Sequence, residues 1–335
     1  MCCLLVFLSS GSWLLAPEEH MDIIVIGCGV SGLSTALQLQ AAGHAVQIWA
    51  RALPPHTTSN VAAAVWYPYK AFPENLVLGW AAASYQAFDA LLGEPDAGVV
   101  LAEGIELFPV AVADPWWKSA VPSFRRAHAD ELPATARDGY VFAAHVIEMD
   151  VYLPYLQGRF LDAGGVIAQH ELHTLDAALE ATDSVVDCAG LGARELVGDE
   201  TLTPIRGQVL RVAQVGVERF TFDDHGPGGV TYIVPRRHDI ILGGTAQEGD
   251  TNLAPDAATA QAILERCAAL EPRLRAAMVL EHRVGLRPGR PAVRLERETL
   301  LGKTIIHNYG HGGAGVTLSW GCADAVVRLL QPATP

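Results

Sequence analysis

Basic residues are scarce in this chain. Its 335 residues include 23 Lys and Arg against 37 Asp and Glu, a formal net charge of −14 at pH 7. Proteins that bind nucleic acids neutralise phosphates with a basic surface, so this balance argues against a nucleic-acid partner. Charged residues make up 18% of the chain and hydrophobic residues 50%, which is too apolar for a disordered protein and enough for a large core.

Cysteine is also sparse. The six cysteines, at positions 2, 3, 28, 188, 267 and 322, include no Cys-x-x-Cys pair. Neither a zinc site nor a disulfide framework is indicated, so we expect buried, reduced thiols in a cytoplasmic protein. The chain has no internal repeat, and its last residues carry no peroxisomal address or lipid anchor.

An apolar stretch precedes the first predicted strand. Residues 2–15 resemble the apolar part of a signal peptide, but no Lys or Arg precedes them and no small-residue cleavage site follows. At about 14 residues the stretch is too short to cross a bilayer comfortably. Because Met21 stands directly before a strand pattern, we interpret residues 1–20 as an upstream extension outside the fold, and we expect no membrane association.

The patterning places strands of parallel type at both ends of the chain and antiparallel strands between them. Residues 22–27 form a continuous apolar run, a helical pattern closes at Gly43, and a second strand over 45–49 completes a β-α-β unit. Further patterns predict helices over 74–92, 151–163, 255–270 and 316–330. Residues 98–112 are predicted to be mostly strand, and residues 109–133, which prolines interrupt, to be a loop. A buried strand is expected within 182–192 and antiparallel hairpins over 205–244. At roughly 150 residues per domain, two domains are expected.

The first motif is Gly27-Cys-Gly29-Val-Ser-Gly32, which follows a predicted strand and opens a predicted helix. Gly27 suits a tight turn, Gly29 lets a pyrophosphate approach the backbone, and Gly32 lets the helix pack against the strand. The helix N-terminus offers free N–H groups to a phosphate. We therefore expect dinucleotide binding; the alternative is a glycine-rich turn without a ligand.

The second strand of the unit lacks the acid that usually binds ribose. The chain there has Ala50 followed by Arg51. Arg51 suits the 2′-phosphate of NADP, the phosphates of FAD, or simple exposure to solvent. The second motif, residues 57–66, combines hydroxyls with small residues, which suits contact with a phosphate and a flat ring. A loop that enters a helix is an equally good interpretation.

The third motif, residues 306–315, is a strand that breaks into glycines before a helix. His307 and His311 are four residues apart, as in some metal sites. That geometry needs a continuous helix, which the glycines at 310, 312, 313 and 315 disfavour, so we reject a metal. A glycine-lined helix N-terminus suits a developing negative charge, such as the N1–C2=O edge of a reduced flavin.

The fourth motif, residues 285–291, holds Arg287 and Arg290 between prolines that fix the backbone. One planar guanidinium is suited to grip a carboxylate with two hydrogen bonds. The alternative, a surface arginine paired with Glu296 or Glu298, suits Arg290 better than Arg287.

These four motifs, in this order, resemble the D-amino-acid oxidase family of FAD enzymes. Further matching pieces are Asp187–Gly190, Pro204–Gln208, Tyr232–Pro235 and Gly243–Thr245, and the likeness covers residues 21–330. It implies an α/β fold: a Rossmann-like FAD-binding domain and a second, α+β substrate domain on a mainly antiparallel sheet. We assign residues 21–85, 150–200 and 285–331 to the FAD-binding domain, and residues 86–149 and 201–284 to the substrate-binding domain.

The resemblance also implies the roles of particular residues. Arg287 binds the substrate α-carboxylate, the Tyr232 hydroxyl contacts the same carboxylate, and the Gly313 backbone lies at the substrate amine. The cofactor-binding set that it implies is Gly27, Gly29, Val30, Ser31, Gly32, Arg51, Thr57, Thr58, Ser59, Ala62, Ala63, Leu172, Gly190, Gly312, Gly313, Gly315, Val316 and Thr317.

The implied reaction is the oxidation of a D-amino acid. Hydride passes from the substrate α-carbon to flavin N5, O2 reoxidises the flavin and gives H2O2, and the imino acid hydrolyses to a 2-oxo acid and ammonia. The expected partners are a D-amino acid and O2, with a possible homodimer. The alternatives are an oxidase of acidic D-amino acids or of glycine and sarcosine, an NADP dehydrogenase, and a silent flavin-binding module, against which Tyr232 and Arg287 speak.

The sequence also departs from the family pattern. The mammalian members place a second tyrosine in the active-site lid, and the matching position here is Gly228, in a stretch (223–229) without any aromatic residue. Their Gly-Leu-Trp-Gln stretch reads Ala64-Val-Trp66-Tyr67 here. These departures bear on the range of substrates.

Overall fold

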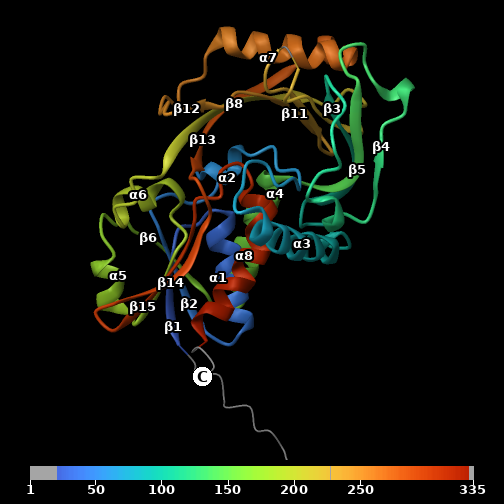
Figure 1. Ribbon diagram of the computed structural model, residues 1–335. Helices are drawn as coiled ribbons and strands as arrows, with labels where there is room; N and C mark the ends of the chain where they lie inside the picture. Colours follow the sequence, from blue (N-terminus) through green and yellow to red (C-terminus); the bar gives the residue numbers. More distant parts are fainter. Residues whose placement is uncertain (1–20, 227, 332–335) are drawn as a thin grey trace, which may run out of the picture.

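Two β-sheets organise the protein. A computed structural model describes residues 21–226 and 228–331, so the upstream extension expected over residues 1–20 lies outside the described residues. A six-stranded sheet occupies one end of the molecule and a nine-stranded sheet the other (Figure 1). The fold class expected from the sequence, α/β with a second, mainly antiparallel α+β part, is confirmed.

The six-stranded sheet has the order β14-β15-β7-β1-β2-β6. All its pairs are parallel except β14 with β15. Its strands are β1 (Asp22–Ile26), β2 (Ala45–Ala50), β6 (Val166–Gln169), β7 (Ser184–Asp187), β14 (Arg294–Leu300) and β15 (Lys303–Tyr309). The β-α-β unit predicted from the first apolar run is therefore present.

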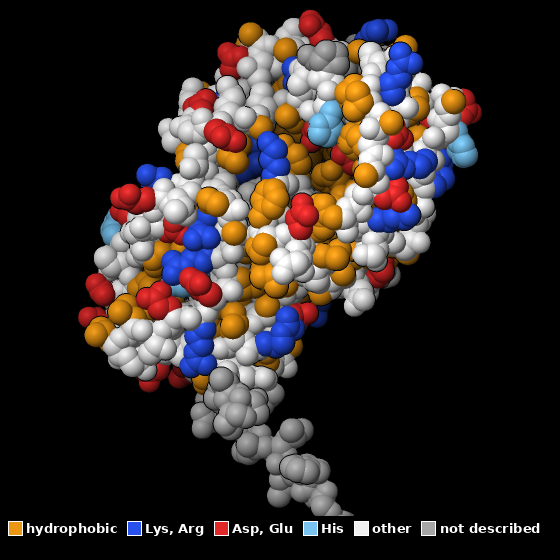
Figure 2. All heavy atoms as spheres, in the orientation of Figure 1, with side chains coloured by type: hydrophobic (Ala, Val, Ile, Leu, Met, Phe, Trp, Pro, Cys, Tyr) orange, Lys and Arg blue, Asp and Glu red, His pale blue; other side chains and the backbone are white. Residues whose placement is uncertain are grey.

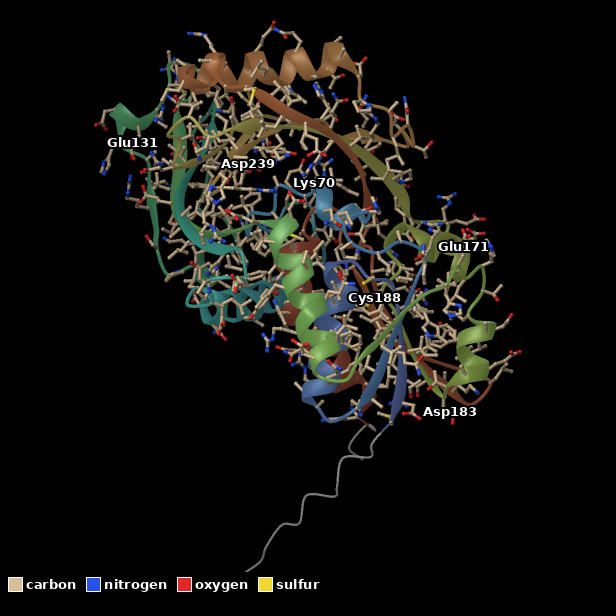
Figure 3. All side chains as sticks on the ribbon, turned by 180° about the vertical axis from the view of Figure 1, so that it is seen from behind. Lys70, Glu131, Glu171, Asp183, Cys188 and Asp239 are labelled. Carbon is tan, nitrogen blue, oxygen red and sulfur yellow. The ribbon has the colours of Figure 1, made fainter. Side chains whose placement is uncertain are left out.

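Both faces of β1 are buried, which explains its unbroken apolar sequence. Ile23 and Val25 face a core that includes Leu33 of α1, whereas Ile24 and Ile26 pack with Leu179 of α5 on the other side. Seen from behind, α1 and α4 lie side by side against this sheet, with Cys188 beside it and Lys70 nearer the other sheet (Figure 3). The helices of this part are α1 (Val30–Ala41), α2 (Thr58–Val61), α3 (Glu74–Leu91), α4 (Met149–Asp162), α5 (Asp176–Ala181), α6 (Ala193–Leu196) and α8 (Gly315–Leu330), with the 3₁₀ turn η3 (Gly190–Gly192).

The nine-stranded sheet has the order β12-β8-β11-β10-β9-β3-β5-β4, with β13 also paired to β8. Its pairs are antiparallel except β3 with β9. Helix α7 (Ala257–Leu270) covers one face (Figure 1), where Ile263 packs on Leu210 and Ile240. The strands are β3 (Val99–Phe108), β4 (Phe124–Arg126), β5 (Asp138–Ile147), β8 (Thr203–Ala213), β9 (Phe220–Phe222), β10 (Tyr232–Pro235), β11 (Asp239–Gly243), β12 (Gln247–Glu248) and β13 (Val279–Gly289), and the 3₁₀ turn η4 (Pro272–Ala276) follows α7.

One element departs from the sequence-based expectation. The stretch predicted as loop, residues 109–133, contains strand β4 and the turns η1 (Lys118–Ala120) and η2 (Ala129–Glu131). The prolines at 122 and 133 flank β4, an edge strand that needs only one partner, β5. Arg126 anchors it by bonding to Asp114 and Asp138. The prediction of a structureless loop was therefore wrong there.

The chain enters the nine-stranded sheet again late in its sequence. Strand β13 pairs with β8 from Val279 to Gly289, so the boundary expected at residue 285 falls inside a strand. The division into domains stays a prediction. Within the described residues, no helix is both long enough and apolar enough to cross a membrane. The four cysteines in the described part of the chain are buried and unpaired, as expected.

Candidate active site

A cavity of about 810 Å³ lies between the two sheets. The face drawn in Figure 2 is hollowed between the two parts of the molecule. Segments far apart in the sequence line the cavity: the loop after β1, residues 50–69, the end of β6, residues 188–196, β8, β10 and β13, and the start of α8. The four sequence motifs thus meet around one space.

The first glycine motif forms one end of the cavity. Gly27 has φ +110°, a conformation that favours glycine, and a β-carbon at Gly32 would stand 1.9 Å from the Gly27 carbonyl oxygen. Gly32 therefore lies beneath the loop and allows α1 to approach it, as predicted. Gly29, the N-cap of α1, provides no side-chain cap, so the N–H groups that follow Val30 in the first turn are open to an anion.

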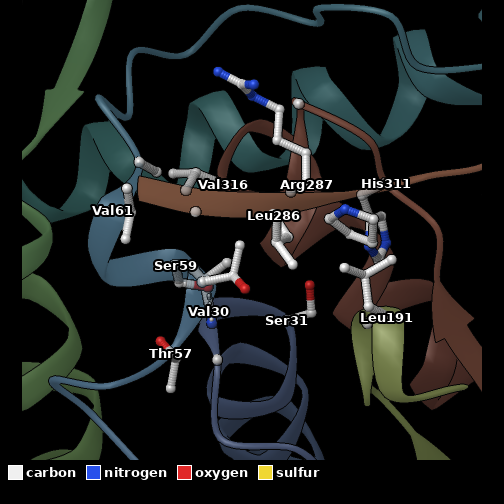
Figure 4. Close-up of a pocket in the computed structure, with 18 of the residues that line it drawn as sticks. Val30, Ser31, Thr57, Ser59, Val61, Leu191, Leu286, Arg287, His311 and Val316 are labelled. Carbon is white, nitrogen blue, oxygen red and sulfur yellow. Dashed lines mark hydrogen bonds between the residues drawn. The ribbon is translucent and has the colours of Figure 1, made fainter. Parts of the chain in front are cut away.

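Residues 57–63 pack against this loop. The Ser59 hydroxyl accepts a hydrogen bond from the Val30 N–H at 3.0 Å. Thr57 is the N-cap of α2, and its hydroxyl donates to Asn60 Oδ1 at 2.7 Å. Figure 4 shows Thr57, Ser59 and Val30 grouped at the same end of the pocket. This end holds the hydroxyls and small residues that the sequence predicted.

The third motif ends β15 and begins α8. His307 hydrogen-bonds to Glu298 at 3.0 Å and His311 to Asn308 at 3.1 Å, so the two imidazoles make separate contacts. Burial lowers the pKa of His311 to about 4, and this imidazole is neutral near pH 7. The described residues contain no group of three or more His, Cys, Asp and Glu that suits a metal ion. Helix α8, like α1, opens on the cavity without a side-chain cap.

Thr317 connects the third motif to the second. Its hydroxyl donates to the Tyr67 carbonyl oxygen at 2.9 Å and accepts from the Tyr67 N–H at 3.0 Å. The side chain is almost fully buried. Thr317 therefore fixes the backbone of Tyr67 at the cavity wall, and its contact with a flavin stays a prediction.

The fourth motif supplies the cation of the site. On β13, Leu286 and Arg287 point to opposite sides of the strand, with Leu286 toward Ser31 (Figure 4). Arg287 donates to the Thr245 carbonyl oxygen at 3.0 Å. Among the described residues no carboxylate lies within ion-pair distance of Arg287, whereas Arg283 bonds to Asp150. A guanidinium held without a carboxylate at a cavity is suited to bind an anionic ligand.

Arg290 has a structural role. Its Nε bonds to Asp199 Oδ2 at 2.9 Å, and the Tyr309 hydroxyl donates to the same oxygen. The expectation that Arg290 pairs with Glu296 or Glu298 was wrong, because Arg294 takes both carboxylates.

Tyr232, on β10, lies near Arg287. Its ring packs on Gly243, where a β-carbon would stand 2.0 Å from Cζ of Tyr232. Burial raises the pKa of Tyr232, and the Arg287 charge opposes that shift. The hydroxyl therefore stays protonated near pH 7 and is able to donate a hydrogen bond.

Every predicted site residue except Gly32 lines the cavity. The lining set comprises Gly27, Gly29, Val30, Ser31, Arg51, Thr57, Thr58, Ser59, Ala62, Ala63, Leu172, Gly190, Tyr232, Arg287, Gly312, Gly313, Gly315, Val316 and Thr317. Their individual roles stay predictions. The structure adds lining residues that sequence reasoning missed, among them Tyr67, Tyr69, His170, Leu191, Phe222, Asp224 and Asn308.

Of the described residues in the stretch 223–229, where the sequence predicted a lid, only Asp224 lines the cavity. Gly228 does not line it, and a β-carbon at that position would meet Cδ of Arg266 at 2.6 Å. Aromatic rings come from other elements instead: Tyr67 and Tyr69 after α2, and Phe222 of β9. The Tyr67 and Phe222 ring centroids are 5.2 Å apart.

The fold and the site together are typical of a dinucleotide-binding enzyme, with an arginine that lines its cavity. Two uncapped helix N-termini and the glycine-rich approach fit a long, doubly phosphorylated cofactor. The sequence model of the family described as "FAD dependent oxidoreductase" matches residues 22–329, and the chain therefore belongs to this family. FAD as the cofactor, expected from the sequence, is confirmed.

Three curated relatives are similar over nearly their full length. A D-amino-acid oxidase of Rubrobacter xylanophilus is 56% identical over 312 residues, which cover 92% of this chain and 96% of the relative. A D-amino-acid oxidase of Dictyostelium discoideum is 40% identical, covering 94% and 93%. A human D-aspartate oxidase is 38% identical, covering 92% and 94%. The resemblance stated from the sequence motifs is confirmed.

Solved structures support the fold. A glycine oxidase of Geobacillus kaustophilus superposes with a TM-score of 0.77 at 19% identity, covering 95% of this chain and 97% of that one. An iminodiacetate oxidase of Chelativorans gives a TM-score of 0.74 at 17% identity, covering 93% and 97%. At these identities the likeness concerns the fold alone.

Proposed function

We propose that this protein is an FAD-dependent oxidase of D-amino acids. The observation that carries the proposal is Arg287, a guanidinium without a carboxylate partner among the described residues, which lines the same cavity as Tyr232 and the start of α8. The names of the relatives that are 56% and 40% identical support the same activity. The substrate is a small molecule with an anionic group.

The residues of the chain bind and orient that substrate. Arg287 grips the α-carboxylate, Tyr232 donates a hydrogen bond to it, and the Gly313 backbone faces the amine. FAD, held by the glycine loop after β1, residues 57–63 and the start of α8, would supply the acceptor for the α-hydrogen as hydride and the centre that reduces O2 to H2O2, and the imino acid would hydrolyse to a 2-oxo acid and ammonia. His311 stays neutral and buried at the cavity, so it adds no charge there.

The proposal also covers how the protein binds its cofactor and where it acts. We propose the cofactor-binding set and the two discontinuous domains given above, the use of O2, a cytoplasmic location and a possible homodimer. Fractionation of the source cells and size-exclusion chromatography of the purified holoprotein test the location and the dimer.

The test is a peroxide-coupled assay on purified holoprotein whose flavin content is known from its visible absorbance. The panel contains D-alanine, L-alanine, D-aspartate, sarcosine and glycine. We expect peroxide with D-alanine and none with L-alanine. A higher rate with D-aspartate would favour the acidic alternative, which the human relative represents. A flavin-loaded protein that oxidises none of these substrates contradicts the proposal.

A further inference from the structure

A second, smaller cavity opens beside the substrate end of the site. It measures about 400 Å³, and Tyr67, Tyr69, Asp224 and Val230 line both cavities. Glu106 and Lys70 line only the smaller one. We call this space the annexe. Because the two spaces share a wall next to Arg287, a substrate held at Arg287 by its carboxylate has the annexe within reach of its side chain.

Glu106 is a buried acid that lines the annexe. The residue is only 3% exposed, and the Tyr67 hydroxyl donates a hydrogen bond to Oε1 of Glu106 at 2.7 Å. The other oxygen, Oε2, is buried without a hydrogen-bond partner among the described residues. Strand pairing sets this position, since Glu106 of β3 lies opposite Phe222 of β9, two residues before Asp224. Buried carboxylate oxygens are costly to leave unpaired, so the free oxygen indicates a missing donor.

Asp224 adds a second carboxylate at the junction of the two cavities. Its Oδ1 is also buried without a hydrogen-bond partner. Arg287 lines the same larger cavity as Asp224, and no ion pair joins the two in the described part of the chain. Burial raises the pKa of Asp224, and the charges of His225, Lys70 and Arg287 oppose that shift.

Lys70 and His225 also line the annexe. Both are exposed, and Lys70 Nζ lies 5.3 Å from the centroid of the Tyr69 ring. His225 stacks on Phe108 at 5.2 Å. The buried side chain of Glu106 therefore lies in the inner part of the annexe, and the Lys70 ammonium lies at its solvent side.

We propose that the annexe is the side-chain pocket of the enzyme and that Asp224 and Glu106 select D-amino acids whose side chain ends in a cationic amine or guanidinium. A substrate such as D-lysine spans the site with its carboxylate on Arg287 and its ε-ammonium at Asp224 and Glu106, which supplies the donors that both carboxylates lack. The Asp224 carboxylate disfavours acidic side chains by like-charge repulsion. This inference rests on the proposed oxidase activity.

The kinetic test uses a matched pair of substrates. D-Lysine and D-norleucine have chains of equal length and differ in the terminal ammonium. We expect kcat/KM to be about tenfold or more higher for D-lysine, because one charged hydrogen bond is worth that factor. In Asp224→Asn the D-lysine to D-norleucine ratio should fall at least tenfold, and Glu106→Gln should lower it as well.

Asp223→Asn is the matched control. It removes the same charge one residue away, but Asp223 lines neither cavity and its carboxylate lies against Gly226. In Asp223→Asn the ratio of kcat/KM for D-lysine to that for D-norleucine should stay within about twofold of the parent value. A parent enzyme that oxidises D-norleucine as well as D-lysine, or a ratio that Asp223→Asn lowers as much as Asp224→Asn, overturns the proposal.

A binding test separates this inference from the oxidase activity. 6-Aminohexanoate is lysine without the α-amine, so it binds without reacting, and hexanoate and adipate are its neutral-tailed and acidic-tailed counterparts. Calorimetry on the holoprotein should give the order 6-aminohexanoate, hexanoate, adipate from tightest to weakest, and Asp224→Asn should remove the preference for the first. Peroxide from D-alanine together with equal affinities for the three probes would refute the inference and leave the oxidase. No peroxide from any D-amino acid would refute the oxidase instead.

Discussion

Arg287 lies directly over Gly207. A β-carbon at Gly207 would stand 2.4 Å from Nη1 of Arg287 and 2.7 Å from its Cζ. Strands β8 and β13 run antiparallel, and Gly207 pairs with Gly285, two residues from Arg287. The glycine therefore leaves the space in which the guanidinium lies, and the position of this cation depends on a residue of the neighbouring strand.

Replacement of Arg287 by alanine tests its role directly. Removing the guanidinium partner of a bound carboxylate typically costs on the order of 2–5 kcal/mol. We expect Arg287→Ala to lower kcat/KM for D-alanine about a hundredfold or more, with flavin content unchanged. Arg297→Ala is the control, because Arg297 bonds to the Leu329 carbonyl oxygen and Thr304 away from the cavity. A loss of less than threefold in Arg287→Ala would remove this arginine from the substrate site.

Gly207→Ala tests whether the space under Arg287 matters. The nearest atoms to the new methyl group belong to the flexible end of the Arg287 side chain, so the guanidinium moves and the backbone does not. Displacement of a binding group by about 1 Å costs up to a hundredfold in rate. We expect kcat/KM to fall roughly tenfold or more while Tm shifts by only a few degrees. If kcat/KM of Gly207→Ala equals that of the parent, the reaction does not depend on a fixed position of the Arg287 guanidinium.

Tyr232→Phe should be milder. The change removes one hydrogen bond from a neutral donor to the charged carboxylate, worth about 1.5–3 kcal/mol, and leaves the ring on Gly243. We expect KM for D-alanine to rise on the order of tenfold with little change in kcat, since the same bond is made to bound substrate and transition state. Steady-state kinetics on the two proteins make the comparison. A fall in kcat of a hundredfold with constant KM would show that Tyr232 acts on the reaction step and not on binding.

The sequence predicted those parts of the site that backbone rules constrain. Gly27 adopts a positive φ and Gly32 lies against the Gly27 carbonyl oxygen, so both positions favour glycine. The two residues are therefore visible in the sequence as a local glycine motif. Arg287 and Arg290 stand in the same proline-framed segment, and the sequence favoured Arg287 for the site because a carboxylate pairing suited Arg290 better. The structure does pair Arg290 with a carboxylate, but with that of Asp199.

The side-chain end of the cavity was missed because it is built by strand pairing across long sequence separations. Asp224 and Glu106 meet only because β9 pairs in parallel with β3, an uncommon connection within a mainly antiparallel sheet. One local indication was present. Glu106 stands between Ile105 and Leu107 in an apolar strand, where a carboxylate is expected only with a reason for its burial. His311 was weighed only as a metal ligand, and its neutral, buried state depends on tertiary burial that no spacing predicts.

The contact between Gly32 and Gly27 predicts how the cofactor end responds to substitution. In Gly32→Ala the added methyl group meets backbone, 1.9 Å from the Gly27 carbonyl oxygen, so α1 and the loop must separate. We expect the purified protein to contain well under half of the parent flavin and to unfold at a lower temperature. Gly79→Ala, in α3 with nothing within 4 Å of the new β-carbon, is the control and should keep its flavin and gain stability. Equal flavin content in both variants would exclude close packing at Gly32 as a requirement.

Burial of Glu106 predicts a pH-dependent stability. Burial raises its pKa from the ordinary 4.5 to about 7, and the hydrogen bond from Tyr67 only partly opposes this shift. The folded protein therefore holds this proton more tightly than the unfolded chain. Stability from this group is complete below about pH 4.5 and declines as pH rises through about 7, by roughly 3 kcal/mol in all.

Glu106→Gln removes that dependence while keeping an oxygen for Tyr67. We expect the Tm of the holoprotein, relative to the parent, to be higher at pH 8 than at pH 5, as scanning calorimetry of both proteins at the two pH values would reveal. Glu103→Gln serves as the control on the same strand, because the Glu103 side chain is 55% exposed. A Tm difference between Glu106→Gln and the parent that is the same at pH 5 and pH 8 would mean that the Glu106 carboxyl does not titrate in this range.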